Sequence, residues 1–190
     1  MSMLPSSSRK TRSRSAALFE RFTSITFTVL RTYAEATSSV QTALALANNE
    51  ASDAIVILSL MSGTGEDLGV RSTLTLPANG HTSLFLREIP GFNSLPSEFR
   101  GVLRITADPS TPIWAINLRS RHNERGDILL STMQVVDEQN GGTSSELIFP
   151  LFADGGGYTT DFLLFSVSGA ATGTLQFNSQ SGEPLPLEVR

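Results

Sequence analysis

The hydrophobic and polar residues of this chain alternate with a period of two over most of its length. Ile25, Phe27 and Val29 alternate with threonines, and the same pattern recurs over residues 70–76. Successive side chains of a β-strand point to opposite faces of a sheet, so this alternation predicts strands. We expect strands at residues 24–30, 40–47, 54–61, 70–76, 82–86, 103–107, 113–118, 128–136, 147–152, 158–167, 173–179 and 185–189.

Two of these segments carry specific expectations about packing. Residues 54–61 read AIVILSLM, a continuous apolar run that is typical of a strand covered on both faces. Residues 103–107 and 113–118 flank the turn ADPST and predict a hairpin, with Trp114, Ile116 and Leu118 on one face. We place Trp114, the single tryptophan, in the core because of that alternation.

Short strands at regular spacing, without a long amphipathic helix, predict an all-β fold of the antiparallel Ig-like β-sandwich type. The composition agrees, because Ser, Thr and Gly are abundant and Lys10 is the only lysine. We expect short helical turns at residues 17–22 and, inside the crossover 87–100, at residues 95–99, and a polar loop at residues 119–127.

The second half of the chain contains an echo of the first. With a shift of about 119 residues, residues 43–46 overlay residues 162–165, and Ser62-Gly63 overlays Ser181-Gly182. Either the chain opens a second copy of its module, or two hairpins of similar length simply look alike. We divide the chain into a disordered basic arm (1–20), a β-sandwich module (21–140) and a partial second β module (141–190). An isolated hairpin is marginally stable, so the partial module would pack on the first module or on a partner chain.

Four segments resemble repeated Ig-like β-sandwich modules of large secreted or surface proteins of environmental bacteria. They are LPANGHTSLFLREIPGF (76–92), FRGVLRI (99–105), LRSRHNERGD (118–127) and FPLFADGGGYTTDFLLFS (149–166). The resemblance covers roughly residues 31–190 and implies an extracellular or cell-surface structural or adhesive role. The family defines no catalytic residues that could be carried over. A basic arm in place of a signal sequence departs from its pattern.

The charge is divided unevenly along the chain. Arg9, Lys10, Arg12 and Arg14 precede the first acidic residue, Glu20, whereas the whole chain has a formal net charge of −4. A basic arm on an acidic body is either a disordered tail or a nucleic-acid contact of a capsid-like shell protein. No run approaches the roughly 18 apolar residues of a membrane helix, so we expect no membrane insertion. The absence of cysteine excludes disulfides and thiolate metal sites.

Candidate chemistry is sparse. The weak binding candidates lie in two loops: Arg119, His122, Glu124, Asp127, Asp154 and Tyr158. His122 and Glu124 would share a face of an extended chain, whereas the simpler interpretation is a solvated loop with local ion pairs. Glycines 155–157 could present backbone amides to an anion or, with Asp161, oxygens to calcium, but a turn between strands explains them equally. Arg125-Gly126-Asp127 matches a tripeptide that some cell-adhesion receptors recognise, but a match of only three residues often arises by chance.

These observations predict a non-enzymatic extracellular structural or adhesive module that self-assembles by strand pairing or strand exchange. The alternatives are a glycan- or calcium-binding module and the capsid-like shell protein. We expect no cofactor and no metal, and as partners other copies of the chain or neighbouring modules. A glycan partner is compatible with the sequence, and a nucleic-acid partner is disfavoured.

Overall fold

A computed structural model describes residues 29–108, 110–139, 146–153, 155–156, 160–166 and 172–185 of the chain. The chain divides into two compact units, Met1–Val135 and Val136–Arg190, which we call the first and second units. The predicted basic arm, the helical turn predicted at residues 17–22 and residues 24–28 of the first predicted strand lie outside the described residues.

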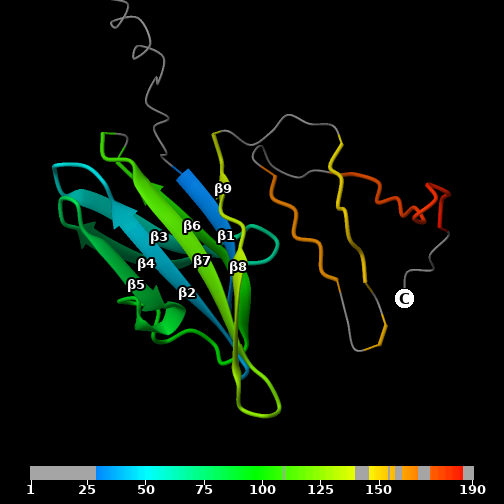
Figure 1. The fold of residues 1–190 in the computed structure, drawn as a ribbon. Helices are drawn as coiled ribbons and strands as arrows, with labels where there is room; N and C mark the ends of the chain where they lie inside the picture. Colours follow the sequence, from blue (N-terminus) through cyan, green and yellow to red (C-terminus); the bar gives the residue numbers. More distant parts are fainter. Residues whose placement is uncertain are drawn as a thin grey trace, which may run out of the picture. The chain divides into compact units, whose positions relative to one another are not determined.

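The first unit is built from antiparallel strands (Figure 1). Its strands are β1 (Val29–Ala36), β2 (Val40–Asn48), β3 (Ala54–Met61), β4 (Asp67–Leu76), β5 (His81–Phe85), β6 (Phe99–Ala107), β7 (Ile113–His122) and β8 (Ile128–Met133). A short 3-10 helix, η1 (Leu86–Glu88), follows β5, and β9 (Val136–Asp137) begins the second unit.

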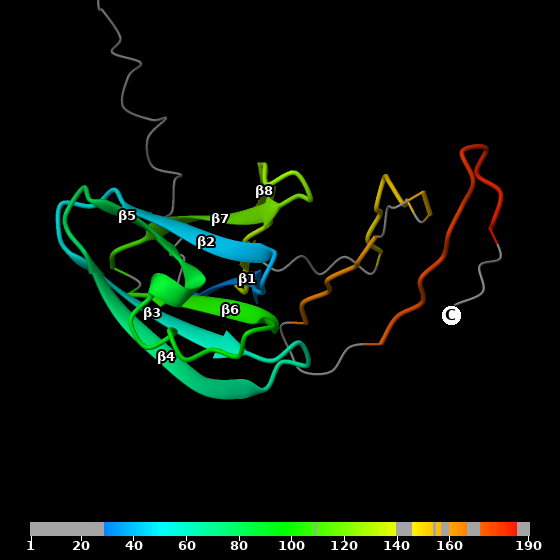
Figure 2. The ribbon, with the colours of Figure 1, turned by 90° about the horizontal axis from the view of Figure 1, so that it is seen from below.

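The strands form two layers. Neighbouring strands follow the order β4-β3-β6-β1-β2-β7-β8, and β5 pairs with the edge of β2 opposite β7. β1 and β2 share a single register pair, Ala36 with Gln41, next to the turn that joins them, whereas the other neighbours pair over longer stretches. The sheet therefore folds over at this corner into layer A (β4-β3-β6-β1) and layer B (β5-β2-β7-β8), which Figure 2 shows from below. The all-β antiparallel prediction is confirmed in this sandwich-like form.

The core lies between the layers and uses one face of each strand. Residues 54–61 form β3 with the predicted bounds, and Val56, Leu58 and Leu60 are fully buried. Ile55 and Ile57 face outward, 55% and 42% exposed. The expectation that both faces of this strand are covered was therefore wrong: an outer strand face of a two-layer sandwich has no further layer against it.

Residues 103–107 and 113–118 form strands but not a hairpin. β6 pairs with β1 and β3 in layer A, whereas β7 pairs with β2 and β8 in layer B. The segment between them crosses from one layer to the other. Asp108 fixes this crossing, since its Oδ1 accepts hydrogen bonds from Ser110 N at 2.8 Å and Ser110 Oγ at 2.6 Å, which lower the pKa of the carboxyl.

The prediction for the faces of β7 was also wrong. Trp114 and Ile116 point outward, 65% and 54% exposed, and the opposite face carries Ile113 and the fully buried Asn117. Asn117 Nδ2 donates hydrogen bonds to Thr32 Oγ1 and to the carbonyl oxygen of Tyr33, both at 2.6 Å. These bonds satisfy the amide nitrogen inside the sandwich, whereas Asn117 Oδ1 is buried without a hydrogen-bond partner among the described residues. A polar residue therefore occupies the interior face while a tryptophan lies outside.

The crossover between β5 and β6 closes one end of the core with the buried side chains of Leu86, Ile89, Phe92 and Leu95. Its helix is η1, whereas residues 95–99 contain a turn at Ser97-Glu98 without a helix, and β6 begins at Phe99. Arg87 holds the crossover, because its guanidinium donates to the carbonyl oxygens of Leu95 at 2.7 Å and Ala36 at 3.0 Å.

The described residues of the second unit contain the short strand β9 and an isolated antiparallel β-bridge between Asn178 and Pro184. The strands predicted at 147–152 and 173–179 are absent from these residues, and so is the described part (160–166) of the predicted strand 158–167. The segment 185–189 lies outside the described residues apart from Leu185. A period of two therefore did not suffice here, because strands form only where a neighbouring strand accepts their backbone hydrogen bonds.

Candidate functional site

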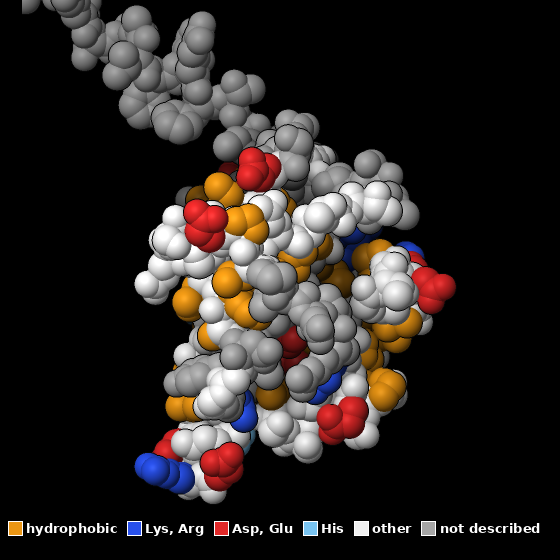
Figure 3. All heavy atoms as spheres, turned by 90° about the vertical axis from the view of Figure 1, so that its right-hand side faces the viewer, with side chains coloured by type: hydrophobic (Ala, Val, Ile, Leu, Met, Phe, Trp, Pro, Cys, Tyr) orange, Lys and Arg blue, Asp and Glu red, His pale blue; other side chains and the backbone are white. Residues whose placement is uncertain are grey.

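The outer side of layer B carries a continuous group of uncharged, mostly apolar side chains, which we call the apolar face. It comprises Ala43, Ala45, Ala47, Phe85, Trp114, Ile116, Leu118, Ile128 and Leu130. Large hydrophobic side chains reach the surface at many points of the described chain, as Figure 3 also shows. On layer B they are aligned by the strand register, and a large exposed apolar patch marks an interaction surface.

The apolar face has a row of small side chains beside a row of large ones. The three alanines of β2 point outward because the alternate residues, Leu44 and Leu46, fill the core. The neighbouring positions of β7 are large, with Trp114 opposite Ala47 and Ile116 opposite Ala45. A row of methyl groups therefore runs alongside a row of bulky side chains.

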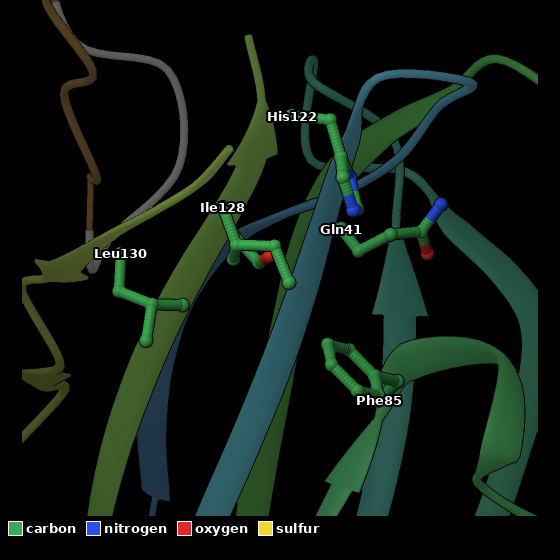
Figure 4. A pocket seen from close by; sticks show the side chains of 6 residues that line it. Gln41, Phe85, His122, Ile128 and Leu130 are labelled. Atoms are coloured by element: carbon green, nitrogen blue, oxygen red, sulfur yellow. The ribbon is translucent and has the colours of Figure 1, made fainter. Parts of the chain in front are cut away.

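A hollow of about 550 Å³ lies at one end of the apolar face, where β7 meets β8 (Figure 4). It is lined by Gln41, Phe85, Ser120, His122, Ile128 and Leu130. His122 pairs with Ile128 and Ser120 with Leu130 across the two strands, which puts these four side chains on the outer side of layer B. The hollow has an apolar floor with an imidazole and an amide at its rim.

Of the predicted site residues, His122 lines this hollow, whereas Glu124 and Asp127 lie in the tight turn beyond it. Asn123 organises that turn: its Oδ1 accepts from Asp127 N at 2.8 Å, and its Nδ2 donates to Asp127 Oδ2 at 2.9 Å. Gly126 adopts a φ of 82°, which glycine tolerates without strain. The Asp127 carboxylate thus serves the turn, and Glu124 is exposed.

Arg119 was placed in a polar loop, and this was wrong because β7 continues through His122. Its side chain belongs to the interior end of layer B, where Nε donates to Glu35 Oε2 at 2.8 Å. Glu35 is 5% exposed, and its other oxygen lies 3.5 Å from Arg100 Nε. A buried carboxylate that holds two guanidinium groups joins the two layers, which is a structural task.

The other two candidates, Asp154 and Tyr158, lie outside the described residues. Within the described part of the chain, no group of three or more histidine and carboxylate side chains could hold a metal ion. The same residues include no helix with the length and hydrophobicity needed to cross a membrane.

The outer side of layer A carries a polar row beside the exposed Ile55 and Ile57. Arg71, Ser59, Arg104 and Arg31 form one row across β4, β3, β6 and β1. A shallow hollow of about 300 Å³ follows this row. Asp67 lies at its edge, and the hydrogen bonds from Gly69 N and the Arg71 guanidinium hold the pKa of its carboxyl below the ordinary value of 3.8.

Comparisons with known proteins leave the chain without a family. No family of known proteins matches the sequence, and no curated protein matches it. Among solved structures, "Crystal Structure of Thermotoga maritima 1070" is similar to this chain with a TM-score of 0.43 and 8% identity. The match covers 55% of this chain and 91% of that one.

Proposed function

We propose that this chain is a non-enzymatic structural module whose sandwich associates with a second copy of itself through the apolar face of layer B. The observation that carries the proposal is the register of that face, in which the row of alanines on β2 runs beside the row of large side chains on β7. Two such faces related by a two-fold axis can each place Trp114 and Ile116 over the alanines of the other. This arrangement removes the exposed tryptophan from water on both sides.

The composition of the face supports association. None of its nine residues is charged, and depletion of charge with enrichment of aromatic residues is typical of the buried centre of an interface. Layer A offers no equivalent, because its outer side carries the arginine row. The resemblance of the sequence to modules of bacterial surface proteins favours a structural role at the cell surface.

Sedimentation equilibrium of the full chain tests the association. We expect a dimer whose dissociation constant rises at least about tenfold for Ile116→Lys, because a buried ammonium without a partner is strongly unfavourable. Ile55→Lys is the matched control: Ile55 is 55% exposed and Ile116 is 54% exposed, but Ile55 lies on layer A. A chain that stays monomeric at the highest attainable concentration contradicts the proposal, and so does equal weakening by both substitutions.

A further inference from the structure

The turn that joins β3 to β4 has a characteristic set of hydrogen bonds. Ser62 N donates to Glu66 O at 2.8 Å, and Gly65 N donates to Ser62 O at 3.0 Å. The hydroxyl of Ser62 accepts from Glu66 N at 3.1 Å and lies 2.8 Å from the hydroxyl of Thr64. Gly65 has a φ of 89°. The sequence of this turn is SGTGE.

The same turn recurs in the second unit, 117 positions later, with the sequence SQSGE. Ser179 N donates to Glu183 O at 2.7 Å, and Gly182 N donates to Ser179 O at 3.0 Å. The Ser179 hydroxyl accepts from Glu183 N at 3.1 Å and lies 2.8 Å from the Ser181 hydroxyl. Gly182 has a φ of 88°. The strand pair that flanks the turn is reproduced as well: Met61 pairs with Asp67, and Asn178 pairs with Pro184.

A second link recurs with nearly the same spacing. In the first unit, Thr42 Oγ1 of β2 accepts a hydrogen bond from Glu35 N of β1 at 2.8 Å. In the second unit, 118 positions later, Thr160 Oγ1 accepts from Ala153 N at 3.1 Å. The link recurs after 118 positions and the turn after 117 positions. The connection between the counterparts of β2 and β3 is therefore one residue shorter in the second unit than in the first.

These registers replace the shift of about 119 expected from sequence. The change from 119 to 118 at the link between the first two strands exchanges the two faces of a strand, whereas the change from 119 to 117 at the turn keeps them. With the register of the turn, Leu175 and Phe177 match Leu58 and Leu60, which are fully buried in β3. The intervening positions, which match the outward residues of β3, are polar in the second unit: Thr172, Thr174, Gln176 and Asn178.

The aromatic side chains of the second unit obey the same correspondence. Phe152, Phe162 and Phe177 are mutual neighbours, with ring centroids 4.7 to 6.3 Å apart. They match Ala34, Leu44 and Leu60 of the first unit, which are all buried in its core. Phe152 is nevertheless 40% exposed. The cluster thus has the pattern of an interior that is still open on one side.

We infer that residues 147–185 correspond to β1, β2, β3 and the first two residues of β4 in a second sandwich with the topology of the first unit, completed by a polypeptide segment with the residue pattern of β6 and β7. In the first unit, β6 lies between β1 and β3 and pairs with both, and β7 pairs with β2. The described second unit has the link from β1 to β2 and the link from β3 to β4, but no ladder between these two pairs. The missing partner is therefore an extended strand with apolar side chains at alternate positions, as Leu103, Ile105 and Ala107 are in β6.

The register defines an experiment on the full chain. Arg190 corresponds to Thr73, so a copy of residues 74–135 attached after Arg190 continues the repeat without interruption. We expect the amides of residues 172–178 to exchange with solvent at least roughly 100-fold more slowly in the extended chain, since they become part of a closed core. Hydrogen exchange with mass spectrometry measures this.

Matched substitutions separate this result from unspecific collapse. In the extended chain, Phe177→Asp should abolish the protection, whereas Gln176→Asp, on the neighbouring outward position, should leave it intact. Equal effects of the two substitutions contradict the inference.

In the first unit, residues 74–135 fit a core that contains Ala34. The copy attached after Arg190 meets the larger Phe152 at this position, which can prevent the second core from closing. The extended chain is therefore also made with Phe152→Ala, which restores the residue of the first unit. Absence of protection with either residue at position 152 overturns the inference. Protection in the unextended chain that rises with concentration also overturns it, because another copy of the chain then fills the place.

Discussion

The two layers of the sandwich distribute polarity in opposite ways. Layer A follows the familiar pattern, with Leu103 and Ile105 inside and an arginine row outside. Layer B departs from this pattern, because Asn117 is buried between the layers while Trp114 lies outside. Alternation separates the two faces of a strand, but it does not say which face is the interior, because an interface can be as apolar as a core.

The largest expected effect concerns the apolar interior. Leu103→Ala, which removes a fully buried side chain from layer A, should lower the free energy of unfolding by about 3 kcal/mol through lost burial and the cavity left behind. Leu130→Ala on layer B removes the same atoms from a side chain that is 68% exposed and should cost less than about 0.5 kcal/mol. Urea unfolding measures both values at a protein concentration low enough to keep the chain monomeric, since the proposed dimer buries Leu130. Similar costs would mean that the apolar face is covered within the monomer.

The polar interior of layer B gives the next effect. Asn117→Ala should lower the free energy of unfolding by about 2 kcal/mol, because it leaves the buried Thr32 hydroxyl and the half-buried Tyr33 carbonyl without the amide donor. Thr132→Ala, on the exposed side of the neighbouring strand, is the control and should be nearly neutral. If Asn117→Ala were neutral too, the interior of layer B would admit water.

The ion pair between the layers should contribute less than Asn117. Glu35→Gln keeps the shape of the side chain but removes the charge that faces Arg119 and Arg100, and we expect a loss of about 1 kcal/mol. Because Glu35 is buried, this loss should change little between low and high salt, unlike that of an exposed pair. Thermal unfolding at two ionic strengths measures the difference, and a loss that disappears in high salt would place the pair in solvent.

The smallest effect belongs to the exposed edge of layer A. The folded state lowers the pKa of Asp67, so its contribution to stability is fully present above the unfolded value of 3.8 and is lost as the pH falls through the folded value. Asp67→Asn should therefore slightly flatten the acid limb of the stability curve and leave its slope above pH 5 unchanged. A steeper acid limb in the variant would contradict the assignment.

Much of the first unit could be predicted from the sequence. The strand at residues 40–47 is extended by one residue in β2, and β3 has the predicted bounds. The predicted hairpin was wrong because the sequence shows a turn after β6 but not which strand lies next to β6 in space. The candidate site was also predicted only in part. His122 was identified from its residue type. The row of alanines has no chemical signal along the chain and lies beside large side chains only because β7 pairs with β2.

The sequence by itself determined that this chain forms strands, where β2, β3 and β5 begin and end to within one residue, and which residues share a strand face. These are local properties, set by the period of two and by the glycine, proline and asparagine residues between the strands. Only the tertiary structure decided which face is buried, which strands are neighbours and how far the second unit repeats the first. Those properties depend on hydrogen bonds and contacts between residues far apart in the chain, and no single stretch of sequence contains both partners.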